Sequence, residues 1–269
     1  MGFVNGAWSG PFIGSTSSGY VRDLLRTPDG SVWAAADNDG LYRWNGSTWR
    51  QVSKADTVSL ALGRDGVVRA AMDSELGVVV RSYYLDGRTW RQGASTAPPT
   101  NLIASPALSS PAHLAVGRDG TIWVGTFGWG ARPHLLRYVN GAWELVYPAG
   151  GTAPVAVSDI TVAPNGDVWV VGQTDNTTSF GPRWISRFDG TRWTLPGETT
   201  WLSPDTWITG IAAAADGTIW ALAQGGLARF DGTRWTRLYE TLSLAAISVA
   251  PDGTVWVHGP SGVVRLPAP

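Results

Sequence analysis

The stretch ADGTIWALAQGGLARFDGTRWTRL, residues 215–238, decides the fold of this 269-residue chain. It holds two Asp-Gly pairs, each flanked by apolar residues and followed within a few positions by Trp. Asp-Gly between apolar segments is a strong signal for a β-hairpin, because the tight turn needs positive φ at its centre. Together with the short apolar run 211–213 before it, the stretch predicts four antiparallel strands, which we call A to D.

The same unit recurs along the whole chain. Six copies of its first turn are found: PDGSVW (28–33), RDGVVR (64–69), RDGTIW (118–123), PNGDVW (164–169), ADGTIW (215–220) and PDGTVW (251–256). One four-stranded unit leaves apolar faces uncovered, and stacking such units around an axis buries them. The repeats therefore predict an all-β fold, a six-bladed β-propeller with four antiparallel strands per blade.

The repeat boundaries divide a single domain of residues 1–269 into blades. The blades are expected at about 20–52, 56–92, 111–147, 155–195, 207–238 and 244–266. The last of them has no fourth strand. Residues 4–8 read VNGAW, which is the phrase that leads into strand D in other copies. Because an unpaired sheet edge invites aggregation, we expect residues 2–9 to complete blade 6 and close the ring.

The high tryptophan content fits this architecture. The chain has 16 Trp residues, and eleven of them begin strand B or strand D of the repeat. They are Trp33, Trp123, Trp169, Trp220 and Trp256 on strand B, and Trp8, Trp49, Trp90, Trp143, Trp193 and Trp235 on strand D. Regular placement on paired strands predicts packing between blades rather than a binding site. Arg69 takes the strand B place in blade 2, so this blade should pack differently.

Composition limits the classes of partner. The net charge is −1 and only 15% of the residues are charged, which argues against nucleic acid as a partner. No apolar run is long enough to insert into a membrane, and the chain has no Cys. The N-terminus does not have the pattern of a signal peptide. We expect a monomer, and both a cytoplasmic protein and an extracytoplasmic domain of a larger protein fit these data.

Residues 215–238 resemble the repeat of two-component-regulator propellers, in which DG-T-I/V-W is followed by G-L-x-R-F-D-G-x-x-W. The DG-x-V-W and DG-x-x-W phrases are also similar to tectonin repeats. The first resemblance implies a sensory or ligand-binding extracytoplasmic domain, and the second implies recognition of carbohydrate or protein. Neither resemblance assigns a catalytic residue, because both motifs concern blade packing.

The loops between strands B and C and between strands D and A should all lie on one face of the disc. These loops differ greatly in length, whereas the Asp-Gly and Asn-Gly turns on the other face are uniform, so we expect the function on the loop face. Candidate ligand-binding residues in or beside the loops are Phe127, Trp129, His134, Phe180, Trp184, Trp201, Trp207 and His258. The aromatic side chains suit stacking on a ligand, and packing the loops onto the disc is an equal alternative.

One position per blade begins strand A next to the central channel on that face. These six mouth positions are Asp23, Ser59, His113, Asp159, Gly210 and Ala246. Two carboxylates and one imidazole at a channel mouth are candidates for acid–base chemistry or for a divalent metal. Ser59 is a further candidate contact to a ligand. The alternative is that these side chains cap backbone groups.

The sequence therefore predicts a ligand-recognition propeller that binds a small molecule, glycan or peptide in a loop-lined pocket over the channel. The alternative is a propeller enzyme, a hydrolase or lyase, that uses His113 with Asp23 and Asp159 and has the option of a metal ion at the same three residues. No organic cofactor is expected, because no nucleotide-binding motif is present.

Overall fold

A computed structural model describes most residues of the six repeats. The described residues are 2–4, 7–9, 21–36, 38–74, 77–99, 102, 110–127, 135–146, 155–174, 183–195, 208–223, 226–239, 246–250, 252–259 and 262–266. Within these ranges every regular element is a β-strand. No helix that could cross a membrane is found among these residues.

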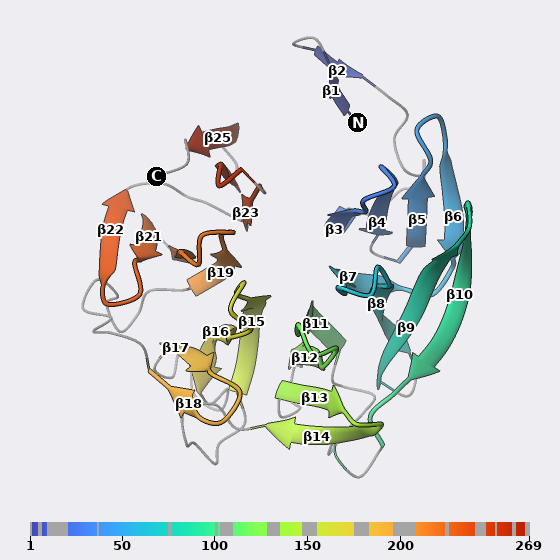
Figure 1. Ribbon diagram of the computed structural model, residues 1–269. Coiled ribbons are helices and arrows are strands. Elements are labelled where there is room, and N and C mark those ends of the chain that lie inside the picture. The colour runs from blue at the N-terminus through green and yellow to red at the C-terminus, as the bar shows by residue number, and fades with distance from the viewer. Residues whose placement is uncertain are drawn as a thin grey trace.

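Six antiparallel sheets surround a central channel, and each follows the chain from the inside outwards (Figure 1). Blade 1 consists of β3 (Val21–Arg26), β4 (Val32–Ala36), β5 (Gly40–Trp44) and β6 (Trp49–Ser53). Blade 2 consists of β7 (Thr57–Leu62), β8 (Val68–Ser74), β9 (Gly77–Asp86) and β10 (Thr89–Thr96). Blade 3 consists of β11 (Ser110–Val116), β12 (Ile122–Phe127), β13 (Leu135–Val139) and β14 (Ala142–Val146).

The other three blades continue the same order. Blade 4 consists of β15 (Val155–Val162), β16 (Val168–Thr174), β17 (Arg183–Phe188) and β18 (Trp193–Thr194). Blade 5 consists of β19 (Ile208–Ala213), β20 (Ile219–Ala223), β21 (Gly226–Phe230) and β22 (Trp235–Tyr239). Blade 6 consists of β23 (Ala246–Val249), β24 (Val255–Gly259) and β25 (Gly262–Leu266). The predicted six-bladed β-propeller is confirmed.

The N-terminal segment does not take the place expected for it. β1 (Gly2–Val4) and β2 (Ala7–Ser9) pair with each other, with Phe3 opposite Trp8, and the sheet of blade 6 has three strands. In Figure 1 this hairpin lies apart from β25. The predicted pairing of residues 2–9 with blade 6 is therefore wrong in this structure. The physical reason is local: Asn-Gly favours a hairpin, and a short loop costs little closure entropy.

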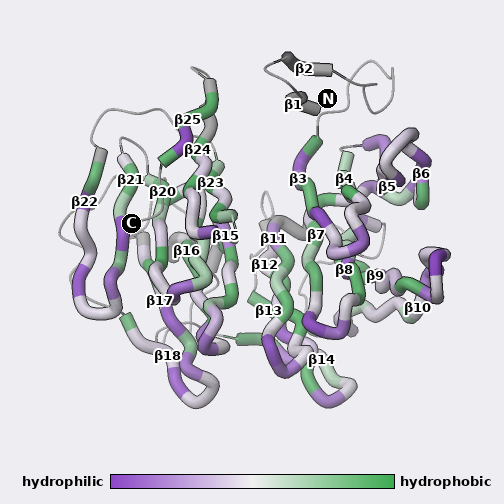
Figure 2. Tube along the Cα trace, turned by 45° about the horizontal axis from the view of Figure 1, so that its top comes forward, coloured by the Kyte–Doolittle hydropathy of each residue, from purple (hydrophilic) through white to green (hydrophobic). Residues whose placement is uncertain are grey.

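The turns between strands A and B explain the repeated Asp-Gly and Asn-Gly pairs. In each of the six turns the glycine has φ between +73° and +98°, a conformation that other residues rarely adopt. The Asp or Asn before it accepts a hydrogen bond from the backbone N–H two residues later, as in Asp119 to Thr121 at 3.0 Å. Figure 2 shows such hydrophilic turns at the ends of strands that carry hydrophobic residues.

Tryptophan side chains on strand B join consecutive blades. Trp169 of blade 4 packs against Phe230 and Trp235 of blade 5, at ring-centroid distances of 5.3 Å and 6.3 Å. Trp123 of blade 3 makes the same kind of contact with Phe188 and Trp193 of blade 4. The strand B tryptophan of one blade thus meets the aromatic residues on strands C and D of the next blade. This confirms the packing role predicted for Trp123 and Trp169, whereas Trp256 of blade 6 is 43% exposed and does not have the predicted packing.

Blade 2 departs from this packing, as predicted. Arg69 stands in the strand B position, and its guanidinium lies 2.7 Å from the Asp65 carboxylate of the preceding turn. The Arg69 side chain is only 12% exposed. On the opposite face of the interface Trp143 donates a hydrogen bond from Nε1 to the Thr96 hydroxyl at 2.9 Å. Polar contacts therefore replace one aromatic cluster between blades 2 and 3.

Candidate functional site

The six mouth positions lie on the innermost strands, where each strand A begins. In blades 1 to 5 the pairing of strands A and B shifts by one residue just before the mouth position, for example between Val157 and Asp159. Such a bulge leaves one residue unpaired and re-aims the side chains beside it. The repetition of the bulge shows that the mouth positions share one backbone geometry.

Side chains at the mouth positions of blades 1 to 4 each contact the next blade. The Asp23 carboxylate of blade 1 accepts hydrogen bonds from the Leu60 backbone N–H at 2.8 Å and the Ser59 hydroxyl at 3.1 Å. The Ser59 oxygen of blade 2 accepts one from the Leu114 backbone N–H at 3.1 Å. Each acceptor therefore satisfies a backbone donor at the start of the next strand A, which is a structural role.

Asp159 continues this chain of contacts into blade 5. Its Oδ2 accepts a hydrogen bond from the Ile211 N–H at 2.9 Å, and its Oδ1 accepts one from the Ile160 N–H at 2.8 Å. The Nδ1 of His113 lies 3.1 Å from the same Oδ1. The connection between blades 3 and 4 is thus a contact between two side chains, and Asp159 is held in place by backbone donors from two blades.

The His113 imidazole uses one of its two nitrogen atoms, Nδ1, in the contact with Asp159. Its side chain is 35% exposed, and among the described residues Nε2 has no hydrogen-bond partner. Asp159 on Nδ1 fixes the ring orientation, as a carboxylate does for histidines that bind or react through the other nitrogen. The arrangement can present Nε2 to a molecule in the channel mouth as a donor, an acceptor or a proton-transfer group.

The electrostatic surroundings favour the charged form of His113. Burial opposes a charge on the imidazole, but the Asp159 carboxylate beside it and the more distant Asp23 carboxylate outweigh this and raise the His113 pKa above its ordinary 6.5. Burial also raises the pKa of Asp23, against the lowering effect of its hydrogen bonds from Leu60 and Ser59. Asp23 already accepts three donors, counting its own neighbour Leu24, so it is less available for a ligand than His113.

The predicted metal site finds no support in the described part of the chain. No group of three or more His, Asp or Glu side chains there is arranged to hold a metal ion. The carboxylate oxygens of Asp23 and Asp159 point to backbone N–H groups instead. The residues brought together at the mouth are Asp23, Ser59, His113 and Asp159, which join consecutive blades.

The predicted ligand-binding aromatic residues are only partly placed. Trp184 on β17 is half-buried against the core between blades 3 and 4, and its Nε1 is buried without a hydrogen-bond partner. Phe127 on β12 and His258 on β24 are placed by their backbone alone; His258 is opposite Ala246, at the mouth. The candidates outside the described residues are Trp129, His134, Phe180, Trp201 and Trp207.

Two features of the mouth have no signal in the sequence. The residues at the bulge are Arg22, Val58, Ala112, Ser158 and Thr209, which share no residue type. The pairing of His113 with Asp159 joins residues of different blades, so spacing along the chain did not reveal it. The register of polar residues at the start of strand A was the only signal for the site.

The fold and its mouth define the class of this protein: a six-bladed β-propeller in which a series of polar contacts joins blades 1 to 5 at one end of the channel. No protein-family model and no curated protein match the chain. Among solved structures, it is similar to the extracellular domain of the putative hybrid two component system BT3049 from B. thetaiotaomicron. The TM-score is 0.67 at 13% identity, over 92% of this chain and 33% of that chain.

Propellers named as enzymes are also similar. Virginiamycin B lyase from Staphylococcus aureus gives a TM-score of 0.62 at 15% identity, covering 92% of this chain and 84% of that one. A gluconolactonase from Xanthomonas campestris gives 0.58 at 14% identity, covering 93% and 86%. The chain also spans 38% of the extracellular domain of BT4673 from B. thetaiotaomicron. These identities establish the fold alone, and at that level they support the resemblance to two-component-regulator propellers.

Proposed function

We propose that this propeller is a recognition module that binds a small molecule, glycan or peptide over the channel mouth. The observation that carries the proposal is the His113 imidazole, which Asp159 contacts at Nδ1 and whose Nε2 has no hydrogen-bond partner among the described residues. Ligand sites commonly combine a few oriented polar groups with aromatic walls. Here Trp184, Phe127 and His258, together with Trp129, His134, Phe180, Trp201 and Trp207, are the proposed wall.

Two substitutions test the roles of the two nitrogen atoms of His113 separately. Asn places its amide N–H near the position of Nδ1, so His113→Asn keeps a donor for Asp159 and removes Nε2. Gln reaches the position of Nε2, so His113→Gln keeps the group that faces the mouth and removes the contact with Asp159. The pair distinguishes a ligand contact from a contact that holds the blades together.

The test is a binding screen of the full chain against glycan, peptide and small-molecule libraries, followed by titration of each hit with both variants. The expected result is a hit that His113→Asn binds at least about tenfold more weakly while its circular dichroism spectrum stays that of the folded protein, and that His113→Gln binds better than His113→Asn does. If every hit binds His113→Asn as tightly as it binds the unmodified protein, His113 is not the ligand contact.

An enzyme is the second candidate, because a histidine oriented by a carboxylate is also the arrangement of a general acid–base residue. In that case His113 transfers the proton, Asp159 positions it, and Asp23 supports the neighbouring strand. The likeness to propellers named as a lyase and a gluconolactonase adds to this candidate at the level of fold. Turnover of a hit by the unmodified protein, lost in His113→Asn, would select the enzyme over the recognition module.

A further inference from the structure

The opposite end of the channel carries a pair of arginine residues. Arg64 in blade 2 and Arg118 in blade 3 precede the Asp-Gly pair of the turn between strands A and B. The other four copies have Pro or Ala at this place: Pro28, Pro164, Ala215 and Pro251. The two arginines therefore stand on adjacent blades, while the blades opposite them offer uncharged residues.

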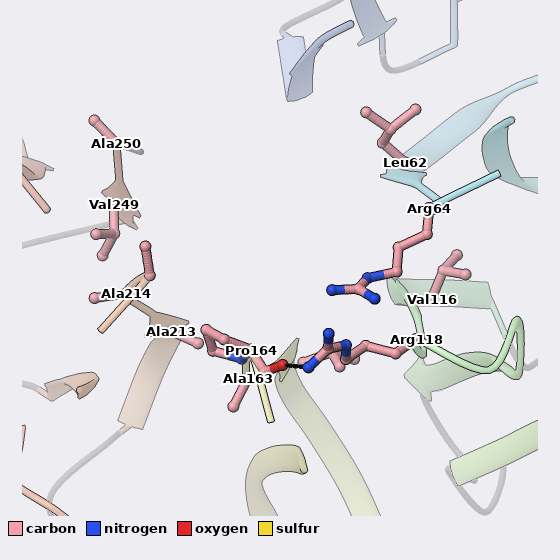
Figure 3. A pocket seen from close by; sticks show the side chains of 12 residues that line it. Leu62, Arg64, Val116, Arg118, Ala163, Pro164, Ala213, Ala214, Val249 and Ala250 are labelled. Carbon is pink, nitrogen blue, oxygen red and sulfur yellow. Dashed lines mark hydrogen bonds between the residues drawn. The ribbon is translucent and has the colours of Figure 1, made fainter. Parts of the chain in front are cut away.

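These arginines line a cavity of about 340 Å³ at that end of the channel, which we call the turn-side cavity. Arg64 and Arg118 point into the hollow from one side in Figure 3. Ala213, Ala214, Val249 and Ala250 line the side opposite them. Small-molecule sites are commonly about 300–1,000 Å³ and mostly apolar, with a few polar groups that fix orientation. The described residues that line the turn-side cavity are apolar in type except for Arg64 and Arg118, and polar groups make up about half of the surface that they expose to it.

The charges in the turn-side cavity are not neutralised by its own lining. Arg64 and Arg118 are the charged residues among the described residues that line it. The nearest carboxylates in sequence are committed elsewhere: Asp65 pairs with Arg69 at 2.7 Å, and Asp119 accepts hydrogen bonds from Thr121 at 2.8 Å and 3.0 Å. Two guanidinium groups that converge without a counter-charge repel each other, and an anion between them removes that repulsion.

A structural role accounts for one arginine but not for the other. Arg118 donates a hydrogen bond from Nη1 to the backbone carbonyl of Pro164, which connects blade 3 to blade 4. Arg64 is exposed, and within the described part of the chain its guanidinium has no hydrogen bond or ion pair. Arg64 is therefore the residue whose place at the cavity needs another explanation.

We propose that the turn-side cavity binds a small amphipathic carboxylate. The carboxylate group lies between the guanidinium groups of Arg64 and Arg118, because the planar donors of arginine match its two oxygens. The aliphatic part lies against Ala213, Ala214, Val249 and Ala250, where it leaves water. This site is separated from His113 by the length of strand A, so it is a second site and does not depend on the function proposed for the mouth.

The test uses octanoate as the probe, titrated into the full chain by isothermal calorimetry at low ionic strength. Octanoate is expected to bind, and Arg64→Gln is expected to raise its Kd at least about tenfold, because a charge-assisted pair is lost. Arg64 is the residue to change, since Arg118 also holds Pro164. Circular dichroism and the melting temperature of Arg64→Gln should match those of the unmodified protein.

Arg192→Gln is the matched control, because it removes the same charge from a turn on the same face. The Arg192 side chain is 78% exposed and does not line the turn-side cavity. Its octanoate affinity should equal that of the unmodified protein, as should that of His113→Asn. Octanol, the uncharged analogue, should bind far more weakly than octanoate.

Several results would overturn this proposal. They are failure of octanoate to bind, equal Kd values for Arg64→Gln and the unmodified protein, and equal binding of octanol and octanoate. Loss of octanoate binding in His113→Asn would mean that octanoate binds at the His113 mouth, and this result would also overturn the proposal. None of these results would argue against a ligand at the His113 mouth, so the two proposals can fail separately.

Discussion

The interface between blades 4 and 5 differs sharply from the place where blade 6 faces blade 1. Trp169 of blade 4 is 3% exposed, whereas Trp256, at the same strand B position in blade 6, is 43% exposed. On the receiving side Ile211 of blade 5 is 3% exposed and Leu24 of blade 1 is 60% exposed. Figure 1 shows neighbouring sheets at the first place and a gap between β3 and β23 at the second.

This difference shows that a strand B side chain is buried only where a neighbouring blade covers it. Trp169 in PNGDVW and Trp256 in PDGTVW take the same place in the repeat, and each is the second residue of strand B in its blade. What differs is the surface that meets them. Trp169 meets Phe230 and Trp235 of the next blade, whereas the Trp256 ring contacts Arg265 of its own blade, 5.9 Å from its centroid. The strand B tryptophan therefore stabilises the fold only when the next blade provides residues that pack against it.

The largest expected effect is on the closed interface. Trp169→Ala removes a buried indole from between two blades and should lower the free energy of unfolding by about 3–5 kcal/mol. Equilibrium unfolding in urea, followed by circular dichroism, measures this loss. A cost below about 1 kcal/mol would break the comparison, because it would mean that the aromatic cluster is not what holds these blades together.

The next effect concerns the hydrogen bonds at the channel mouth. Asp159→Ala leaves the buried N–H groups of Ile160 and Ile211 without their acceptor, and each such loss costs about 1–3 kcal/mol. Urea unfolding should show a clear decrease in stability. Asp231→Ala is the control, since its hydrogen-bond donors among the described residues all lie in its own exposed turn. An equal decrease in both variants would contradict the role of Asp159 between blades.

A smaller effect depends on pH. The folded protein raises the His113 pKa above 6.5, so the contact with Asp159 contributes its full stability below about pH 6.5 and loses it as pH rises through the folded pKa. The stability difference between the unmodified protein and His113→Asn should therefore be larger at pH 5.5 than at pH 8.5. Urea unfolding at the two pH values measures it, and NMR titration of the imidazole gives the pKa. A His113 pKa below 6.5 would contradict the attraction by Asp159.

The smallest effect is expected at the open face. Trp256→Ala should change the free energy of unfolding by less than about 1 kcal/mol, because the side chain is 43% exposed. Acrylamide should quench a Trp fluorescence component that is absent from Trp256→Phe. If Trp256→Ala costs as much as Trp169→Ala, blade 6 is covered in solution, and the contrast between the two regions disappears.

Much of the fold could be predicted because its signals are local. An Asp-Gly pair specifies its own turn, and Trp at a fixed distance from it specifies the start of strand B. The different packing of blade 2 could be predicted because Arg69 stands where the repeat otherwise has Trp. The expected partner of residues 2–9 was wrong because the choice of a partner strand is non-local. The phrase VNGAW predicts a hairpin, and the structure has that hairpin, but the phrase does not say which sheet it joins.

Less of the site could be predicted. The polar register at Asp23, Ser59, His113 and Asp159 was visible, but three of these side chains turn out to serve backbone groups of the next blade, tens of residues further along the chain. Sequence does not show which acceptors are already occupied. The sequence also shows Arg64 and Arg118 beside their Asp-Gly turns. It does not predict that the two side chains line one cavity, because that depends on how the blades are arranged around the channel.

The bulge before each mouth position has a consequence for protein engineering. In blades 1 to 5 the bulge recurs at the same place, and the residue that follows it differs from blade to blade: Asp23, Ser59, His113, Asp159 and Gly210. The backbone thus fixes the direction of the side chain, while the residue type decides which group of the next blade it can bind. A designer who exchanges residues here can keep the bulge, but each new side chain must still supply the acceptor that Asp23, Ser59 or Asp159 now gives to the next strand A.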